Sequence, residues 1–244
     1  MKQQATWLVV VAILSFALGL VAATFSSFSE FVPELLRGVW VTIQITAGGA
    51  VVAVVAAFFA AMGKLYGPGP IRWLSITYIE TFRGTSALVQ LFWLFYVLPY
   101  FGLMLEPMAV AIFALGLNVG AYGAEVVRGA IGAVPRGQWE ACVALNMTRL
   151  QTVLRIILPQ AFVAMIPPWG NLFIELLKAT ALVSLITLSD LAFKAQQLNQ
   201  NTLRTVEIFT IVLLTYLAIS LLITLGMRAL ERHAAHGLGR GGER

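Results

Sequence analysis

Two pairs of oppositely charged side chains stand three residues apart inside long apolar stretches of this chain of 244 residues. They are Glu80 with Arg83, and Glu175 with Lys178. An ionised group near the centre of a bilayer costs about 2.5–3.5 kcal/mol on insertion scales, so it usually faces a cavity or a partner. On a helix, the i,i+3 spacing allows each pair to neutralise itself. Alternatively, the four groups bind the carboxylate and the amine of a zwitterionic solute that passes between helices.

Asn118 and Asn171 also lie within apolar stretches and are further candidates for polar groups that line such a cavity. Residues suited to catalysis do not accompany them. Both histidines, His233 and His236, lie near the C-terminus, and a single cysteine, Cys142, excludes an internal disulfide and a Cys-based metal site. The sequence also lacks the G-x-x-x-x-G-K-[ST] nucleotide-binding motif. It therefore predicts a protein that is not an enzyme and holds no metal or cofactor of its own.

The composition places these residues in a membrane protein. Hydrophobic residues make up 59% of the chain and charged residues 11%, with a mean hydropathy of +0.87. Ordinary soluble domains carry about 25% charged residues. Because about 20 apolar residues cross the hydrocarbon core, the sequence predicts an all-α, polytopic transmembrane bundle. We expect its spans near residues 7–25, 38–62, 72–99, 108–127, 161–188 and 206–227.

The first of these spans has two interpretations. The apolar run at 7–25 is longer than the core of about 7–15 residues found in secretory signals, and no A-x-A cleavage site follows it. A retained anchor is therefore favoured over a cleaved signal. The expected organisation is an anchor with an external linker at 1–35, one transport domain at 36–232, and a disordered cytoplasmic tail at 233–244.

The basic residues predict the orientation of the bundle. The net charge is +5, but the Lys and Arg residues are scattered between apolar runs, which argues against nucleic-acid binding. If six spans alternate, one side of the membrane receives most of them, whereas the other side is mixed and more acidic. By the positive-inside rule, both termini and the polar segment 135–159 lie in the cytoplasm. The residues on that side are Lys2, Lys64, Arg72, Arg128, Arg136, Arg149, Arg155, Arg228 and Arg232.

The polar segment PRGQWEACVALNMTRLQTVLRIILP at 135–159 interrupts the apolar runs. Its apolar residues recur at helical spacing, which predicts two short amphipathic helices separated by a hinge at Asn146. Thr148 and Gln151 have the T-x-x-Q spacing of a capping box at the start of the second helix. Such a helix pair suits the groove of a soluble partner, with its apolar face buried. A helix that merely lies on the lipid surface is the alternative.

The spacing within this segment resembles the EAA motif, E-A-A-x3-G-x9-I-x-L-P, of permease subunits of binding-protein-dependent ABC importers. The matching residues are Glu140, Ala141, Cys142, Asn146, Ile156, Leu158 and Pro159. Asn replaces the hinge glycine of the motif, but Asn tolerates the positive φ that such a hinge often needs. The resemblance implies the type I importer permease fold, with five core helices plus an N-terminal anchor helix. It also implies that the ATPase is coupled through Gln138, Glu140, Ala141, Asn146, Leu158 and Pro159.

The same resemblance implies the partners and the location. They are an ABC ATPase dimer in the cytoplasm that binds the ATP, a second permease subunit of the same or another kind, and an extracytoplasmic solute-binding protein. The lipid bilayer would be the bacterial inner membrane, and no nucleic acid is involved.

Longer stretches at 41–46, 78–99, 118–141 and 170–191 resemble the polar amino-acid uptake subfamily. Within this subfamily, the segments ALNM and IELLKATALVSLITLSDL are most similar to permeases for ectoine and hydroxyectoine. A different class, an ion-coupled secondary transporter with Glu80 or Glu175 as its proton site, remains the alternative. That class favours inverted repeats and paired broken spans, and neither is evident in the sequence.

Overall fold

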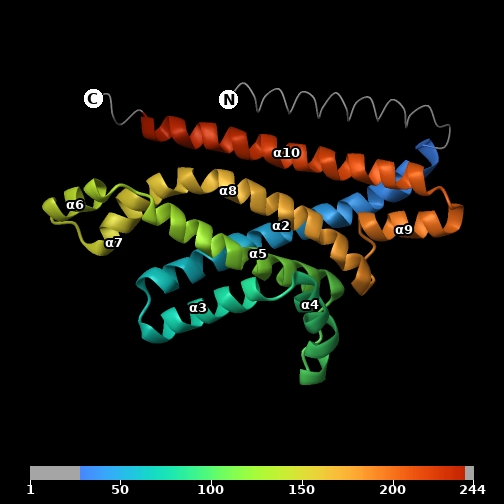
Figure 1. The fold of residues 1–244 in the computed structure, drawn as a ribbon, viewed down its shortest axis with the longest axis horizontal. Helices are drawn as coiled ribbons and strands as arrows, with labels where there is room; N and C mark the ends of the chain where they lie inside the picture. Colours follow the sequence, from blue (N-terminus) through green and yellow to red (C-terminus); the bar gives the residue numbers. More distant parts are fainter. Residues whose placement is uncertain (1–27, 240–244) are drawn as a thin grey trace.

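The computed structural model describes residues 28–239, so the predicted first span at 7–25 lies outside the described residues. Within 28–239 every regular element is helical (Figure 1). Four helices are long and apolar enough to cross a membrane, and a bent pair raises that number to five. The predicted all-α transmembrane architecture is therefore confirmed for this part of the chain.

Four long helices run lengthwise through the molecule (Figure 1). They are α2 (Phe28–Tyr66), α5 (Pro107–Gly132), α8 (Leu158–Ala179) and α10 (Thr205–Gly239). Shorter α-helices connect or flank them: α3 (Gly69–Gly84), α4 (Ala87–Phe92), α6 (Arg136–Ala144), α7 (Arg149–Thr152) and α9 (Leu191–Thr202). π-Helical turns occupy Trp93–Val97 and Val153–Ile157, and 3-10 turns occupy Leu98–Phe101 and Thr180–Ile186.

Small residues bring α5 against α2 at the centre of the bundle. A Cβ atom added to Gly116 would lie 2.9 Å from the carbonyl oxygen of Gly49. At Gly120 it would lie 3.1 Å from the carbonyl oxygen of Ala53. In a membrane, such small residues allow two helix backbones to approach and gain van der Waals contact. This seam makes α2 and α5 the rigid part of the fold that the remaining helices pack around.

The predicted third span, 72–99, was wrong as a single helix. The chain bends by 108° between α3 and the segment Ala87–Phe101. Thr85 and Ser86 have extended backbones, and the Gln90 amide donates to Thr85 Oγ1 at 2.6 Å and to the Phe82 carbonyl at 2.9 Å. The bond to Phe82 satisfies a carbonyl that a continuous helix would have paired, and the bond to Thr85 holds the Gln90 side chain across the break. A hydropathy window registers only the apolar composition and misses it.

The second helix predicted in 135–159 is not a separate short element. From Arg149 the chain stays helical to Ile186, so the span predicted at 161–188 begins one segment earlier. Pro159 lies within this helical stretch and lacks the N–H donor that would pair a carbonyl of the preceding turn. The chain accommodates it through the π-helical turn at Val153–Ile157. Leu158 and Pro159 therefore join the polar segment rigidly to a membrane helix.

Helix α9 was not predicted, and it lies between the last two long helices. It begins after Asp190, whose carboxylate accepts hydrogen bonds from Phe193 N at 2.9 Å and Ala192 N at 3.2 Å. It ends at Leu203, which has φ of 59°. Its sequence is too short and polar to appear as a span. At the far end of the chain, α10 continues to Gly239, past the predicted start of the tail at 233.

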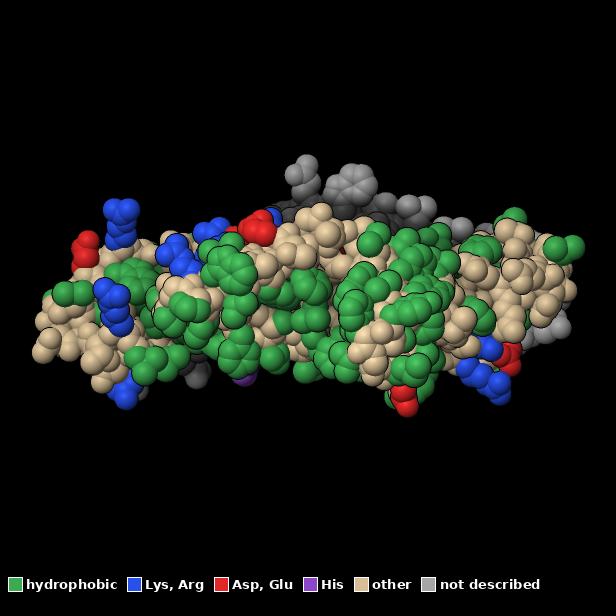
Figure 2. Space-filling model, turned by 90° about the horizontal axis from the view of Figure 1, so that it is seen from below, with side chains coloured by type: hydrophobic (Ala, Val, Ile, Leu, Met, Phe, Trp, Pro, Cys, Tyr) green, Lys and Arg blue, Asp and Glu red, His purple; other side chains and the backbone are tan. Residues whose placement is uncertain are grey.

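The two ends of the bundle differ in charge. Figure 2 shows hydrophobic side chains over the middle of one face, whereas Lys and Arg gather mainly toward the end that carries α6 and α7. The turn between α2 and α3 and the C-terminal part of α10 lie at this same end (Figure 1). The distribution agrees with the alternation of spans used to predict orientation. The cytoplasmic location of this end stays a prediction.

Candidate coupling site and solute path

The hinge of the polar segment has the left-handed conformation that its sequence predicts. Asn146 has φ of 54°. Met147 N donates to the Cys142 carbonyl at 3.0 Å, and Asn146 N donates to the Val143 carbonyl at 2.9 Å. These two bonds form a Schellman motif, which closes the C-terminus of α6. The chain then turns sharply toward α7.

The capping box at the start of α7 is also confirmed. Gln151 N donates to Thr148 Oγ1 at 3.3 Å, and Thr148 N donates to Gln151 Oε1 at 3.0 Å. Both helix ends at the hinge are thus satisfied locally, without help from other parts of the chain. The α6–hinge–α7 unit is therefore preformed, in the sense that its caps and hinge bonds all come from its own residues.

The six residues predicted to couple to the ATPase all lie on or beside this unit. Gln138, Glu140, Ala141 and Asn146 are exposed. Leu158 is half-buried against the main core, and Pro159 is exposed at the start of α8. The unit thus presents one set of residues outward and uses the other to attach itself to the bundle.

Four large apolar side chains are also exposed on the unit. The exposed fractions are 77% for Val143, 74% for Leu145, 69% for Leu150 and 50% for Leu154. Val143 and Leu145 precede the long apolar helical stretch Arg149–Ile186, and Leu150 and Leu154 lie at its start. An apolar cluster of this kind in a polar segment marks a surface that binds a protein or a membrane.

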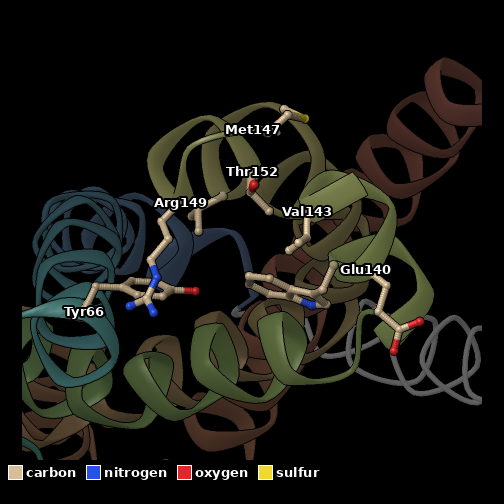
Figure 3. Close-up of a pocket in the computed structure, with 8 residues that line it drawn as sticks. Tyr66, Glu140, Val143, Met147, Arg149 and Thr152 are labelled. Atoms are coloured by element: carbon tan, nitrogen blue, oxygen red, sulfur yellow. The ribbon is translucent and has the colours of Figure 1, made fainter. Parts of the chain in front are cut away.

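A cavity of about 550 Å³ separates the unit from the end of α2. Figure 3 shows Arg149 extending from α7 toward Tyr66 on α2. Glu140 also lines the cavity, but its carboxylate is directed away from these two residues. Val143 and Thr152 line its other side. The cavity reduces the packing of the unit against the end of α2.

One firm contact between α6 and α8 was not predicted. Gln160 Nε2 on α8 donates to Gln138 Oε1 on α6 at 3.2 Å, and it also donates to the Ile156 carbonyl at 3.0 Å. Trp139 packs against the main core from the same helix. The sequence signal that could have predicted this contact is Gln160 itself, which directly follows Leu158 and Pro159. A glutamine at the start of a membrane helix needs a hydrogen-bond partner. Gln138 and Gln160 thus connect α6 to a membrane helix.

An ion cluster fixes α2 to α5 at the same end of the bundle. Lys64 Nζ lies 2.7 Å from Glu125 Oε1, and Arg128 Nε lies 2.7 Å from Glu125 Oε2. Both oxygens of the carboxylate are therefore paired, and the two ion pairs hold the central helix pair together. Among the described residues no group of three His, Cys, Asp or Glu is placed to hold a metal ion.

The predicted solute-path residues divide into two places. Asn118 on α5 is half-buried, and its amide donates to the Phe82 carbonyl at 3.0 Å and to Gln90 Oε1 at 3.1 Å. It thus braces the break between α3 and α4. Arg83 is exposed beside this break, with its guanidinium 5.6 Å from the centre of the Tyr122 ring, and Glu80 is exposed one turn earlier.

The other three candidates share one face of α8. Asn171, Glu175 and Lys178 follow the i, i+4, i+7 spacing, and all three side chains are exposed. No salt bridge within residues 28–239 joins Glu175 to Lys178, nor Glu80 to Arg83. The self-paired arrangement considered from the sequence is therefore absent from this structure.

Comparisons with known proteins agree on one family. The family model described as the binding-protein-dependent transport system inner membrane component matches residues 53–236. The probable amino-acid ABC transporter permease protein y4tF of Sinorhizobium fredii is 47% identical over 208 residues, covering 83% of this chain and 87% of that protein. The L-cystine transport system permease protein TcyB of Bacillus subtilis is 39% identical over 204 residues, with the same coverage of 83% and 87%.

A solved structure supports the same assignment. The crystal structure of an amino acid ABC transporter with histidines has a TM-score of 0.79 and 33% identity, covering 86% of this chain and 98% of that chain. These relatives are membrane transport proteins and not enzymes, and they give no support to the ion-coupled secondary transporter. The chain belongs to the family of binding-protein-dependent transport system inner membrane components, the permeases of ABC importers.

Proposed function

We propose that this chain forms the membrane path of an amino-acid importer and couples it to ATP hydrolysis through α6 and α7. The observation that carries the proposal is the preformed, exposed α6–hinge–α7 unit with the EAA spacing at its centre. The names of the relatives support amino acids as the solute class. Within that class, the stretches ALNM (144–147) and IELLKATALVSLITLSDL (174–191) favour the narrower proposal of ectoine or hydroxyectoine.

The proposed mechanism begins with a solute-binding protein that delivers the solute at the end of the bundle opposite α6. An ATPase dimer binds the exposed face of α6 and α7, and Glu140 makes a polar contact with it. When the ATPase closes, α6 moves, and the hydrogen bond between Gln138 and Gln160 transmits this movement to α8. That helix carries Asn171, Glu175 and Lys178, so the path residues change position relative to the fixed α2–α5 pair.

The exposure of the path residues supports a second permease subunit. Charged side chains on a membrane helix require a polar surrounding, and the described chain does not enclose them. A copy of this chain, or a related permease, placed against α8 would complete the cavity. We propose the bacterial inner membrane as the location, with both termini in the cytoplasm, on the basis of the family description and the basic end of the bundle.

The decisive experiment uses the reconstituted importer with its ATPase and binding protein. Glu140→Ala is expected to reduce uptake and substrate-stimulated ATP hydrolysis at least several-fold, while the permease still inserts in the membrane. Glu106→Ala is the matched control, because Glu106 is an exposed carboxylate at the other end of the bundle. Wild-type coupling in Glu140→Ala would contradict the assigned docking surface. Comparison of labelled amino acids with ectoine in the wild-type importer identifies the solute.

A further inference from the structure

A second pocket, with several polar residues in its lining, lies between α8 and α10, away from the coupling unit. It has a volume of about 400 Å³ and is lined by one stripe from each helix, within residues 167–174 and 224–231. Both stripes have the same i, i+3, i+4, i+7 spacing, so they face each other along one turn after another. Gly170 leaves room here, because an added Cβ would already contact the Met227 side chain at 3.4 Å.

The polar members of the pocket are of both signs. Arg228 and Glu231 line it together with the amide of Asn171 and the hydroxyl of Thr224. Arg228 and Glu231 stand three apart on α10, but they form no salt bridge with each other or with any other residue within 28–239. One guanidinium and one carboxylate give a pocket of zero net charge. Such a pocket complements a ligand that carries one negative and one positive group.

The pocket continues the α8 face that carries the path residues. Asn171 belongs to both, and Glu175 and Lys178 follow it on the same face toward the other end of the helix. Pro167 lines the pocket at the other end of this face.

We propose that this pocket binds the α-carboxylate and α-ammonium of an amino acid at the inner end of the path, before release. Arg228 binds the carboxylate and Glu231 binds the ammonium. Asn171 lies both on the α8 face and in the pocket, so it contacts the solute as it moves from one to the other. The inference rests on the proposed function and adds to it a specific inner binding site. A ligand with only one charge leaves either Arg228 or Glu231 without a partner, which disfavours it.

The test uses the importer reconstituted with its ATPase and binding protein. First, labelled amino acids identify one that the wild-type importer takes up. The same amino acid, its primary amide and its N-acetyl derivative are then added on the ATPase side, and inhibition of uptake is measured. For the wild type we expect the two derivatives, each lacking one charge, to inhibit about tenfold more weakly, the effect of one charge-assisted hydrogen bond.

Two variants separate the roles of the two charges. Arg228→Gln is expected to weaken inhibition by the amino acid about tenfold and to abolish discrimination against the amide. Glu231→Gln is expected to abolish discrimination against the N-acetyl derivative. Arg232→Gln is the matched control, because Arg232 is exposed on α10 and does not line the pocket. A purely structural role of Arg228 or Glu231 would not change discrimination between the derivatives.

The outcomes are distinguishable. If the wild-type importer takes up neither an amino acid nor ectoine, the proposed function fails and the inference fails with it. If it takes up ectoine but no amino acid, only the inference is overturned, because ectoine has no α-ammonium group. If uptake occurs and both variants match Arg232→Gln, only the inference is overturned. If Arg228→Gln responds solely to the phosphatidylglycerol content of the vesicles, the pocket holds a lipid headgroup and the inference is overturned. If Arg228→Gln does not assemble, Arg228→Lys keeps the charge and must retain the discrimination.

Discussion

The amide of Gln160, on membrane helix α8, donates a hydrogen bond of 3.2 Å to Gln138 Oε1, on α6. This bond joins the part of the chain that would contact the ATPase to the helix that carries three of the proposed path residues. The chain also connects them directly, because α7 continues as one helical stretch into α8. The pair is therefore placed to transmit movement of α6 to the path.

We predict that Gln160→Ala partly uncouples transport from ATP hydrolysis. A neutral hydrogen bond of this kind contributes about 0.5–1.5 kcal/mol, so a change of severalfold in the ratio of solute transported to ATP hydrolysed is expected. Gln138→Ala should have the same effect, and the double variant should be no worse than either single one. Gln200→Ala, an exposed glutamine on α9, is the control. Additive losses in the double variant would show that the two residues act separately.

The backbone of Asn146 leads to a second prediction. Asn146 has φ of 54°, and glycine adopts this conformation without strain, so Asn146→Gly should be tolerated. Asn146→Val should weaken the hinge by about 1–2 kcal/mol and reduce substrate-stimulated ATP hydrolysis. Asn201→Val on helix α9 controls for the change of side chain alone. Equal coupling in the Gly and Val variants would mean that the hinge conformation is unimportant for docking.

A third prediction concerns the brace at the helix break. Asn118→Leu removes the donor to Phe82 and Gln90, which should destabilise the fold by about 1–3 kcal/mol. The midpoint of thermal unfolding of the purified permease is then expected to fall by several degrees. Asn171→Leu should leave it unchanged, because Asn171 is exposed and makes no hydrogen bond within the described residues. An unchanged midpoint with lost uptake would instead assign Asn118 to the solute.

These cases show which features a sequence reveals. The hinge at Asn146 and the cap at Thr148 follow from rules that act within four residues, and both were predicted correctly. The break after Gly84 depends on hydrogen bonds from the Gln90 side chain to Phe82 and Thr85. A hydropathy window contains no information about such bonds. Asn118 was assigned to the path by its polarity alone, whereas its partners lie far away in the chain. Tertiary hydrogen bonds of this kind require a structure.

The charges on α8 provide a fourth prediction. Since Glu175 and Lys178 form no ion pair within the described residues, removing one should not leave the other newly unpaired. Glu175→Gln and Lys178→Met are therefore expected to reach normal levels in the membrane and to lose uptake. The double variant should not recover it. Protein level and uptake are scored separately. Low levels in both single variants, restored in the double variant, would favour a structural ion pair.

The last prediction concerns Asp190, which caps α9 outside the membrane-spanning helices. Burial raises the pKa of its carboxyl from 3.8 to about 6, although hydrogen bonds from Phe193 N and Ala192 N act in the opposite direction. Because the folded pKa lies above the unfolded one, the folded state binds the proton more tightly. The contribution to stability is complete below about pH 4 and is lost as the pH rises through about 6.

The difference between the two pKa values corresponds to about 3 kcal/mol. Asp190→Asn should therefore stabilise the permease at pH 7 and flatten the dependence of its thermal midpoint on pH between about 4 and 6, since Asn caps helices as well as Asp does. Asp190→Ala should show the same flattening but lose about 1 kcal/mol from the missing cap. Thermal unfolding of the purified variants across that pH range measures both effects. A wild-type pH profile in Asp190→Asn would show that Asp190 is ionised throughout and that another group titrates.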